Sequence, residues 1–190
     1  MNIYVMRHGT TVWNEIGRIQ GRSKNRLSHD GKILVEKSAK EIKNIQFDVI
    51  YSSPVMRTMQ TANIVNKYLS VEILKDEHIT EINQGVFVGR YKNSLSEEEK
   101  QIRKVRDKNY GLETYEEVYL RVKDFVHELV SQNKYNNVLI ITHSFPATCL
   151  EWVLTDTIPN FDNYIHVKDF KNAEVRKYSI SHDKTTIDIK

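Results

Sequence analysis

The chain contains 190 residues, and its 28% charged and 39% hydrophobic residues are typical of a folded globular protein, which excludes an intrinsically disordered chain. The formal net charge of +3, from 28 Lys and Arg against 25 Asp and Glu, is too small to indicate a nucleic-acid partner. One cysteine excludes an internal disulfide, and no apolar run of about 18 residues indicates a membrane span. We therefore expect a cytoplasmic protein with a single domain over residues 1–190. The sequence does not indicate the oligomeric state.

The first half of the chain alternates short apolar runs with stretches of helical periodicity. Ser28 is a side chain suited to cap a helix, and Ile33, Leu34 and Ala39 then recur at helical spacing. Pro54 suits the first turn of a further helix. The predicted elements of this half are a strand over residues 1–6, a helix over 28–43, a strand over 48–52, a helix over 54–69 and a strand over 71–74.

The second half begins with a highly charged stretch, residues 94–108, where any helix is expected to lie on the surface with its charges in solvent. A longer apolar pattern starts at Thr114 and predicts a helix packed on the sheet. The alternation of strands and helices favours a three-layer α/β/α sandwich with a mostly parallel central sheet. The remaining predicted elements are a strand over residues 138–142, a helix that starts near residue 143, and a hairpin over 173–180 and 185–189.

Polar side chains follow three of the predicted strands. Arg7 and His8 come directly after the first strand. Arg57 follows the second strand, and His143 follows residues 138–142. Right-handed crossovers place the carboxyl ends of parallel strands along one rim, where open α/β sheets build reaction sites. Because an imidazole nitrogen can attack phosphorus and a guanidinium can hold phosphate oxygens bidentately, the pattern indicates phosphoryl chemistry.

Five short motifs follow one another in a fixed order. They are Arg7-His8-Gly9 with Asn14, Arg18-Ile19-Gln20-Gly21, residues 52–62, Glu81-Ile82-Asn83-Gln84-Gly85 and Thr142-His143-Ser144. Their order and spacing resemble the histidine phosphatase superfamily, the phosphoglycerate mutase-like proteins, from residue 2 to about residue 150.

The resemblance implies a role for each motif. His8 would be the nucleophile that becomes phosphohistidine, and Glu81 the proton donor to the leaving oxygen. Arg7, Arg57 and His143 would surround the transferred phosphoryl group. Cations on the equatorial oxygens and an in-line nucleophile serve this reaction, so no metal or cofactor is expected. Further contacts to substrate or phosphate are expected from Asn14, Gln20, Gly21 and Ser144.

The two reacting groups place requirements on their surroundings. Arg7 and Arg57 would disfavour the cationic form of His8, and a backbone carbonyl in the Gly9 turn could fix its tautomer. Glu81 must be held protonated by partial burial, or gain a proton when an anionic substrate arrives. It would then serve as base for the water that cleaves the intermediate.

Three positions depart from the family's pattern. Ser144-Phe145 stands where many relatives have two glycines, and Lys24 and Val88 stand where acidic residues are common. None of these departures removes a catalytic group, but all reshape the rim of the pocket, so a relative's substrate cannot be transferred to this chain. A basic stretch that is either a solvated loop or a positive lip for an anionic substrate contains Arg18, Arg22, Lys24 and Arg26.

Three functions remain open. A metal-independent phosphatase acting on a small phosphorylated metabolite is favoured. A 2,3-bisphosphoglycerate-dependent phosphoglycerate mutase uses the same groups, but such mutases carry a sizeable insertion after the Glu81 segment, and only residues 90–110 lie in the corresponding place. The third is an inactive phospholigand-binding domain, which has no need for a nucleophile and an acid together. The physiological substrate is left open.

Overall fold

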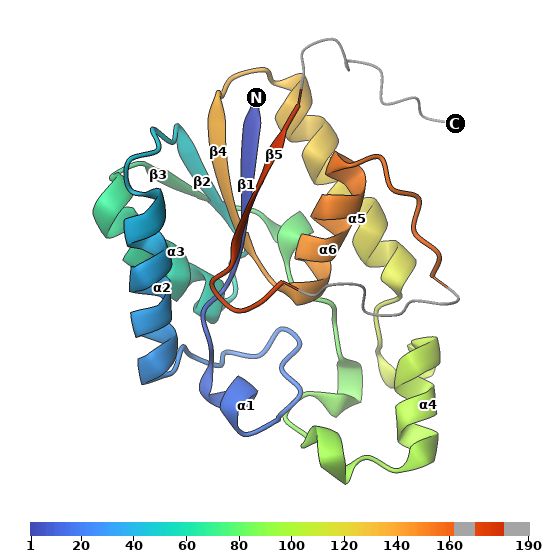
Figure 1. Ribbon diagram of the computed structural model, residues 1–190. Helices are drawn as coiled ribbons and strands as arrows, with labels where there is room; N and C mark the ends of the chain where they lie inside the picture. The colour runs from blue at the N-terminus through green and yellow to red at the C-terminus, as the bar shows by residue number, and fades with distance from the viewer. Residues whose placement is uncertain (162–169, 181–190) are drawn as a thin grey trace.

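The computed structural model, which describes residues 1–161 and 170–180, has a central sheet with helices on both faces (Figure 1). The strand order is β3-β2-β4-β1-β5. Neighbouring strands are parallel except β5, which runs antiparallel to β1 at the sheet edge. The predicted three-layer, mostly parallel architecture is confirmed. The strands are β1 (Asn2–Arg7), β2 (Val49–Ser52), β3 (Glu72–Lys75), β4 (Asn137–Thr142) and β5 (Val175–Ser179).

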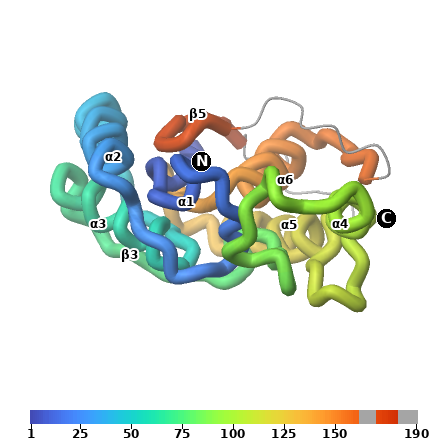
Figure 2. The backbone as a smooth tube through the Cα atoms, turned by 90° about the horizontal axis from the view of Figure 1, so that it is seen from below, coloured from blue at the N-terminus to red at the C-terminus, as the bar shows by residue number. Residues whose placement is uncertain are grey.

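The helices form the two outer layers. Figure 2 shows α2 and α3 on one side of the sheet and α5 and α6 on the other. The helices are α1 (Val12–Glu15), α2 (His29–Ile42), α3 (Met56–Leu69), α4 (Glu97–Val105), α5 (Tyr115–Ser131) and α6 (Ser144–Leu154). Short 3₁₀ turns, among them η3 (Lys92–Ser94), connect β3 to α4. No helix in residues 1–161 and 170–180 combines the length and the apolar character that crossing a membrane requires.

The core lies on both faces of the sheet, because alternate side chains of a strand point to opposite faces. Ile3 and Val5 of β1 pack in the cluster that includes α5 and α6, whereas Tyr4 and Met6 pack in the cluster that includes α2 and α3. Burial on both faces explains why the central strands are continuous apolar runs in the sequence.

The local signals of the sequence are present as expected, with one difference. The Ser28 side chain accepts a hydrogen bond from the backbone N–H of Gly31 and caps α2. The first segment of the predicted hairpin forms β5, which pairs with β1, and residues 185–189 lie outside the described residues. The carboxyl ends of β1, β2 and β4 meet at one edge of the sheet, near α1 and α4 in Figure 1.

Candidate active site

The ends of β1 and β4 bring two histidines together. Arg7 pairs with Thr142 as the last register pair of these strands, and the backbone N–H of His8 then donates to the carbonyl of Thr142 at 2.9 Å. The rings of His8 and His143 lie edge to face with their centroids 5.2 Å apart. Both side chains are buried, with 2% and 0% exposure. The sheet register therefore places both imidazoles at one point, as the sequence predicts.

His8 is held as a neutral imidazole with a defined tautomer. Its Nδ1 lies 2.7 Å from the carbonyl oxygen of Gly9, so Nδ1 carries the proton and donates. Its Nε2 accepts a hydrogen bond from Arg57 Nε at 3.1 Å. Burial, the charge of Arg57 and the charge of Arg7 together hold the pKa of His8 well below its usual value. Nε2 is therefore the unprotonated ring nitrogen, and its one lone pair accepts the Arg57 N–H in this structure.

Arg57 lies on the first turn of α3 and is fully buried beside His8. Its Nη2 donates to the carbonyl of Gly21 at 2.8 Å, which ties the loop that contains Gly21 to the floor of the site. Burial lowers the pKa of Arg57 to about 10, so the guanidinium remains a cation near neutral pH. Its hydrogen-bond acceptors are a neutral imidazole and backbone carbonyls, so its charge is available to an anion.

His143 directly follows β4, and its ring contacts the ring of His8. Its Nε2 lies 2.8 Å from the hydroxyl oxygen of Ser53, the residue that follows β2. Its Nδ1 is buried and has no hydrogen-bond partner among the described residues. Burial and the neighbouring charge of Arg57 hold the pKa of His143 well below its usual value. A neutral ring whose Nε2 accepts from the Ser53 hydroxyl carries its proton on Nδ1, which can then donate to a bound anion.

Glu81 is the acidic group of the site. Its Oε1 accepts from the backbone N–H of Ile82 at 3.0 Å, and burial raises the pKa of its carboxyl against the opposing charges of Arg57 and Arg7. A raised pKa keeps the carboxyl protonated at a higher pH than an exposed glutamate, which is the property of a proton donor.

A second carboxylate, Glu113, holds the loop on which Glu81 lies. Glu113 accepts from the backbone N–H of Asn83 at 2.9 Å, from Arg22 Nη2 at 3.0 Å and from Arg121 Nε at 2.9 Å. Arg22 Nε also donates to the Glu81 carbonyl at 2.9 Å. The sequence contains no local signal of this network, because Arg22 and Glu113 are 91 residues apart in the chain.

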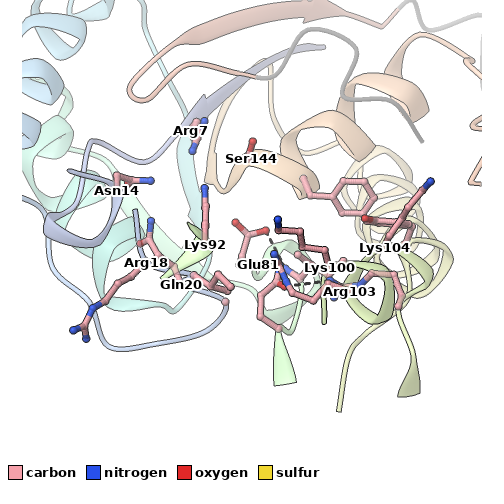
Figure 3. Close-up of a pocket in the computed structure, with 17 residues that line it drawn as sticks. Arg7, Asn14, Arg18, Gln20, Glu81, Lys92, Lys100, Arg103, Lys104 and Ser144 are labelled. Atoms are coloured by element: carbon pink, nitrogen blue, oxygen red, sulfur yellow. Dashed lines mark hydrogen bonds between the residues drawn. The ribbon is translucent and has the colours of Figure 1, made fainter. Parts of the chain in front are cut away.

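These groups surround a pocket of about 600 Å³ (Figure 3). Its lining includes six of the residues predicted from the sequence, Arg7, Asn14, Gln20, Gly21, Glu81 and Ser144. The other three, His8, Arg57 and His143, are buried next to this lining: Arg57 donates to the Gly21 carbonyl, and His8 contacts both Arg57 and His143. Of the predicted basic lip, Arg18 lines the pocket, whereas Arg22 binds Glu113.

The charged stretch 94–108 also contributes to the pocket. α4 is a surface helix without buried residues, as predicted, but the expectation that its charges only face solvent is wrong. One side of α4 contributes to the lining of the pocket. The lining cations that sequence analysis missed are Lys92, Lys100, Arg103, Lys104 and Arg106.

Within the described residues, no three His, Cys, Asp or Glu side chains are grouped as a metal centre requires. The charged groups that can meet an anion in the pocket are arginine and lysine side chains. Arginine is suited to phosphate because its planar fork donates two parallel hydrogen bonds.

Residues 3–189 match the family described as the histidine phosphatase superfamily (branch 1), and the chain belongs to this superfamily. It is 32% identical over 156 residues to phosphoserine phosphatase 1 of Hydrogenobacter thermophilus, which covers 79% of this chain and 74% of that protein. It is 30% identical over 156 residues to a probable phosphoglycerate mutase of Photorhabdus laumondii, covering 79% and 73%. The α-ribazole phosphatase structure from Shigella flexneri superposes with a TM-score of 0.84 at 19% identity, covering 96% and 92%.

Proposed function

We propose that the protein is a metal-independent phosphatase that hydrolyses small phosphomonoesters through a phosphohistidine on His8. The observation that carries this proposal is the state of His8, whose Nδ1 is bonded to the Gly9 carbonyl and whose Nε2 accepts from Arg57. A neutral imidazole whose unprotonated nitrogen lies beside a buried cation is suited to attack phosphorus once the cation turns its N–H groups to the phosphoryl oxygens and stabilises their charge.

The reaction has two steps. In the first, Nε2 of His8 forms a bond to phosphorus, the bond from phosphorus to the ester oxygen breaks, and the carboxyl of Glu81 gives its proton to the leaving alcohol. In the second, the carboxylate of Glu81 takes a proton from water as the water oxygen bonds to phosphorus, and the P–N bond breaks to release phosphate. Arg7, Arg57 and His143 bind the phosphoryl oxygens throughout.

The pocket lining supports further contacts to the phosphate. Asn14 Oδ1 accepts from the backbone N–H and the hydroxyl of Thr11, so its amide Nδ2 is the group left to donate to a ligand. Gln20 Oε1 accepts from Asn25 Nδ2 at 2.7 Å and shares the single hydroxyl proton of Thr11 with Asn14 Oδ1. Because both amide oxygens already accept hydrogen bonds, the NH₂ groups of Asn14 and Gln20 are left to donate to the oxygens of a phosphate.

The test is steady-state hydrolysis of p-nitrophenyl phosphate in the presence of a chelator. His8→Ala is expected to lower kcat by about 10⁴-fold or more, because it removes the nucleophile. The control is His29→Ala, which removes an exposed histidine of α2. The wild type is also expected to form a phosphoenzyme that survives alkali and is lost in acid, as phosphoramidates are. Equal inactivity of wild type and His8→Ala would instead favour a phospholigand-binding domain.

A phosphoglycerate mutase is the second candidate, since the phosphatase and mutase relatives match this chain over equally long segments. Hydrolysis is favoured because Lys92, Lys100 and Lys104, which line the pocket, are exposed, so that water reaches it. Incubation with 3-phosphoglycerate, with and without 2,3-bisphosphoglycerate, separates the two candidates. Release of phosphate supports the phosphatase, and predominant isomerisation would overturn it.

A further inference from the structure

The guanidinium groups of Arg103, in α4, and Arg106, at the end of α4, lie side by side in one wall of the pocket. Arg103 Nη2 and Arg106 Nη1 both donate to Oε1 of Gln84, each at 3.2 Å, and Figure 3 draws these bonds as dashed lines. Like charges this close repel each other, and one neutral amide oxygen balances neither of them. An anion in the pocket would remove this repulsion.

Arg106 is only 4% exposed, and none of its hydrogen-bond partners among the described residues is ionised. Its Nε donates to the Glu113 carbonyl at 2.7 Å and its Nη2 to the Asn83 carbonyl at 2.6 Å. With the Gln84 amide, every acceptor is neutral. Burial, with a smaller contribution from the charge of Arg103, lowers the pKa of Arg106. The carboxylates of Glu113 and Glu81 favour its charge without a direct hydrogen bond, and its guanidinium lies 5.5 Å from the centroid of the Tyr115 ring. The positive charge of Arg106 is therefore only partly compensated.

Arg103 presents an unused donor at the same wall. Its Nε is buried and has no hydrogen-bond partner in the part of the chain that the structure describes. Lys100, at the edge of the wall, pairs at 2.6 Å with Glu97, whose side chain is 89% exposed, and such pairs are weak. In Figure 3 the carboxyl of Glu81 lies between Arg7 on one side and Lys100 and Arg103 on the other.

The pocket holds more positive charge than one phosphoryl group requires. Of the residues that the structure describes, seven cations and one carboxylate, Glu81, line it. Arg7 and the buried Arg57 serve the reacting group in the proposed mechanism. The cations beyond Glu81 therefore remain available to another part of the substrate.

We propose that Arg103 and Arg106, with Lys100 at their edge, bind a second phosphate group, so that the preferred substrates are small metabolites carrying two phosphates. This proposal rests on the proposed function for the phosphate that reacts. A phosphate dianion carries two negative charges and balances two adjacent guanidinium groups, whereas a single carboxylate balances one. The planar fork of each arginine also matches the geometry of phosphate oxygens.

The experiment measures phosphate release from three series of substrates with increasing chain length: α,ω-alkanediol bisphosphates, the matched alkyl monophosphates and the matched ω-phosphoalkanoates. At the best length, kcat/KM for the bisphosphate is expected to exceed that for the monophosphate by about 30-fold or more, chiefly through KM, from two charge-assisted contacts. Arg103→Gln is expected to remove most of this advantage and to affect the monophosphate far less. The control is Lys108→Gln, which removes a 67% exposed lysine outside the lining and is expected to keep the advantage.

Each outcome bears on a separate statement. Equal kcat/KM for monophosphates and bisphosphates overturns the second site and leaves the phosphatase intact. Equal preference for phosphoalkanoates and bisphosphates overturns the assignment to phosphate. If no ester is hydrolysed, calorimetric titration with the bisphosphate and the monophosphate decides: tighter binding of the bisphosphate, lost in Arg103→Gln, supports the site while the phosphatase fails, and equal binding overturns both.

Discussion

The two ends of the pocket are built in different ways. The proposed reacting end consists of His8, Arg57 and His143, which are buried at or just after strand ends. His8 and Arg57 are hydrogen-bonded to each other and to backbone carbonyls, and His143 is hydrogen-bonded to the Ser53 hydroxyl. The opposite wall is carried by α4, which contributes no buried residue. Its attachment is a small separate cluster, in which Ile102 packs against Ile19, Phe87, Leu95 and Leu112.

We infer from this difference that the buried end determines the reaction and that the α4 wall determines the choice of substrate. A change at the strand ends disturbs the sheet register and the core, so the reacting end is tied to the fold. A change on α4 disturbs only a satellite cluster and exposed side chains. We therefore expect relatives to share the reacting end and to differ in the wall, and the following predictions test whether the two ends behave as independent parts.

Apart from removal of the nucleophile, the largest effect is expected at Glu81, which lies between the two ends. Glu81→Gln keeps the acceptor for the Ile82 N–H but removes the proton, so kcat/KM for an alkyl phosphate should fall by about 10³-fold. p-Nitrophenyl phosphate, whose leaving group departs as an anion, should lose far less.

The pH profile checks the same assignment. Because burial raises the pKa of Glu81, the wild type should hydrolyse the alkyl phosphate with full activity below that pKa and lose activity as the pH rises through it. Glu81→Gln should lack this alkaline limb. Equal losses on both substrates, or an unchanged limb, would mean that Glu81 is not the donor.

An intermediate effect is expected at Glu113, which holds the Glu81 loop through Asn83, Arg22 and Arg121. Glu113→Gln should lower kcat on the alkyl phosphate by about tenfold through misplacement of the donor, with a smaller change for p-nitrophenyl phosphate. It should also lower the free energy of unfolding by about 1–3 kcal/mol, because part-buried Arg121 loses an ionised partner. Urea denaturation and the two assays measure these effects.

The control for this prediction is Glu117→Gln at the same junction. Glu117 is exposed and closes the capping box of α5 with Thr114, a role that glutamine also fills. It should alter neither the substrate selectivity nor kcat. If Glu113→Gln slows both substrates equally, Glu113 supports the fold in general and does not position Glu81.

The sequence was sufficient to predict the fold class and most elements, because apolar runs such as residues 138–142 and caps such as Ser28 are local signals. It also predicted that His8 and His143 meet, because both follow buried strands of one parallel sheet. The Gly9 carbonyl that fixes the His8 tautomer lies one residue away in the chain, and this expectation is confirmed as well.

What the sequence could not show depends on contacts between distant segments. The charge pattern of α4 predicts an exposed helix but not which side faces a cavity, because that depends on how residues 92–110 fold back toward Gln84. In the sequence Glu113 is indistinguishable from an ordinary loop carboxylate, because its partner Arg22 lies 91 residues earlier in the chain. The roles of the predicted site residues themselves stay predictions, which the assays above test.

The smallest effect is expected at Glu97, the exposed partner of Lys100. Glu97→Gln should change the free energy of unfolding by less than about 0.5 kcal/mol, as for most surface ion pairs. It releases Lys100 toward the pocket, so KM for the bisphosphate should fall by about twofold. Glu98→Gln removes the same charge one residue along the helix, where no ion pair is formed with Lys100. If both variants lower KM equally, the wall acts only through its overall field, whereas a fall confined to Glu97→Gln means that Lys100 contacts the second phosphate.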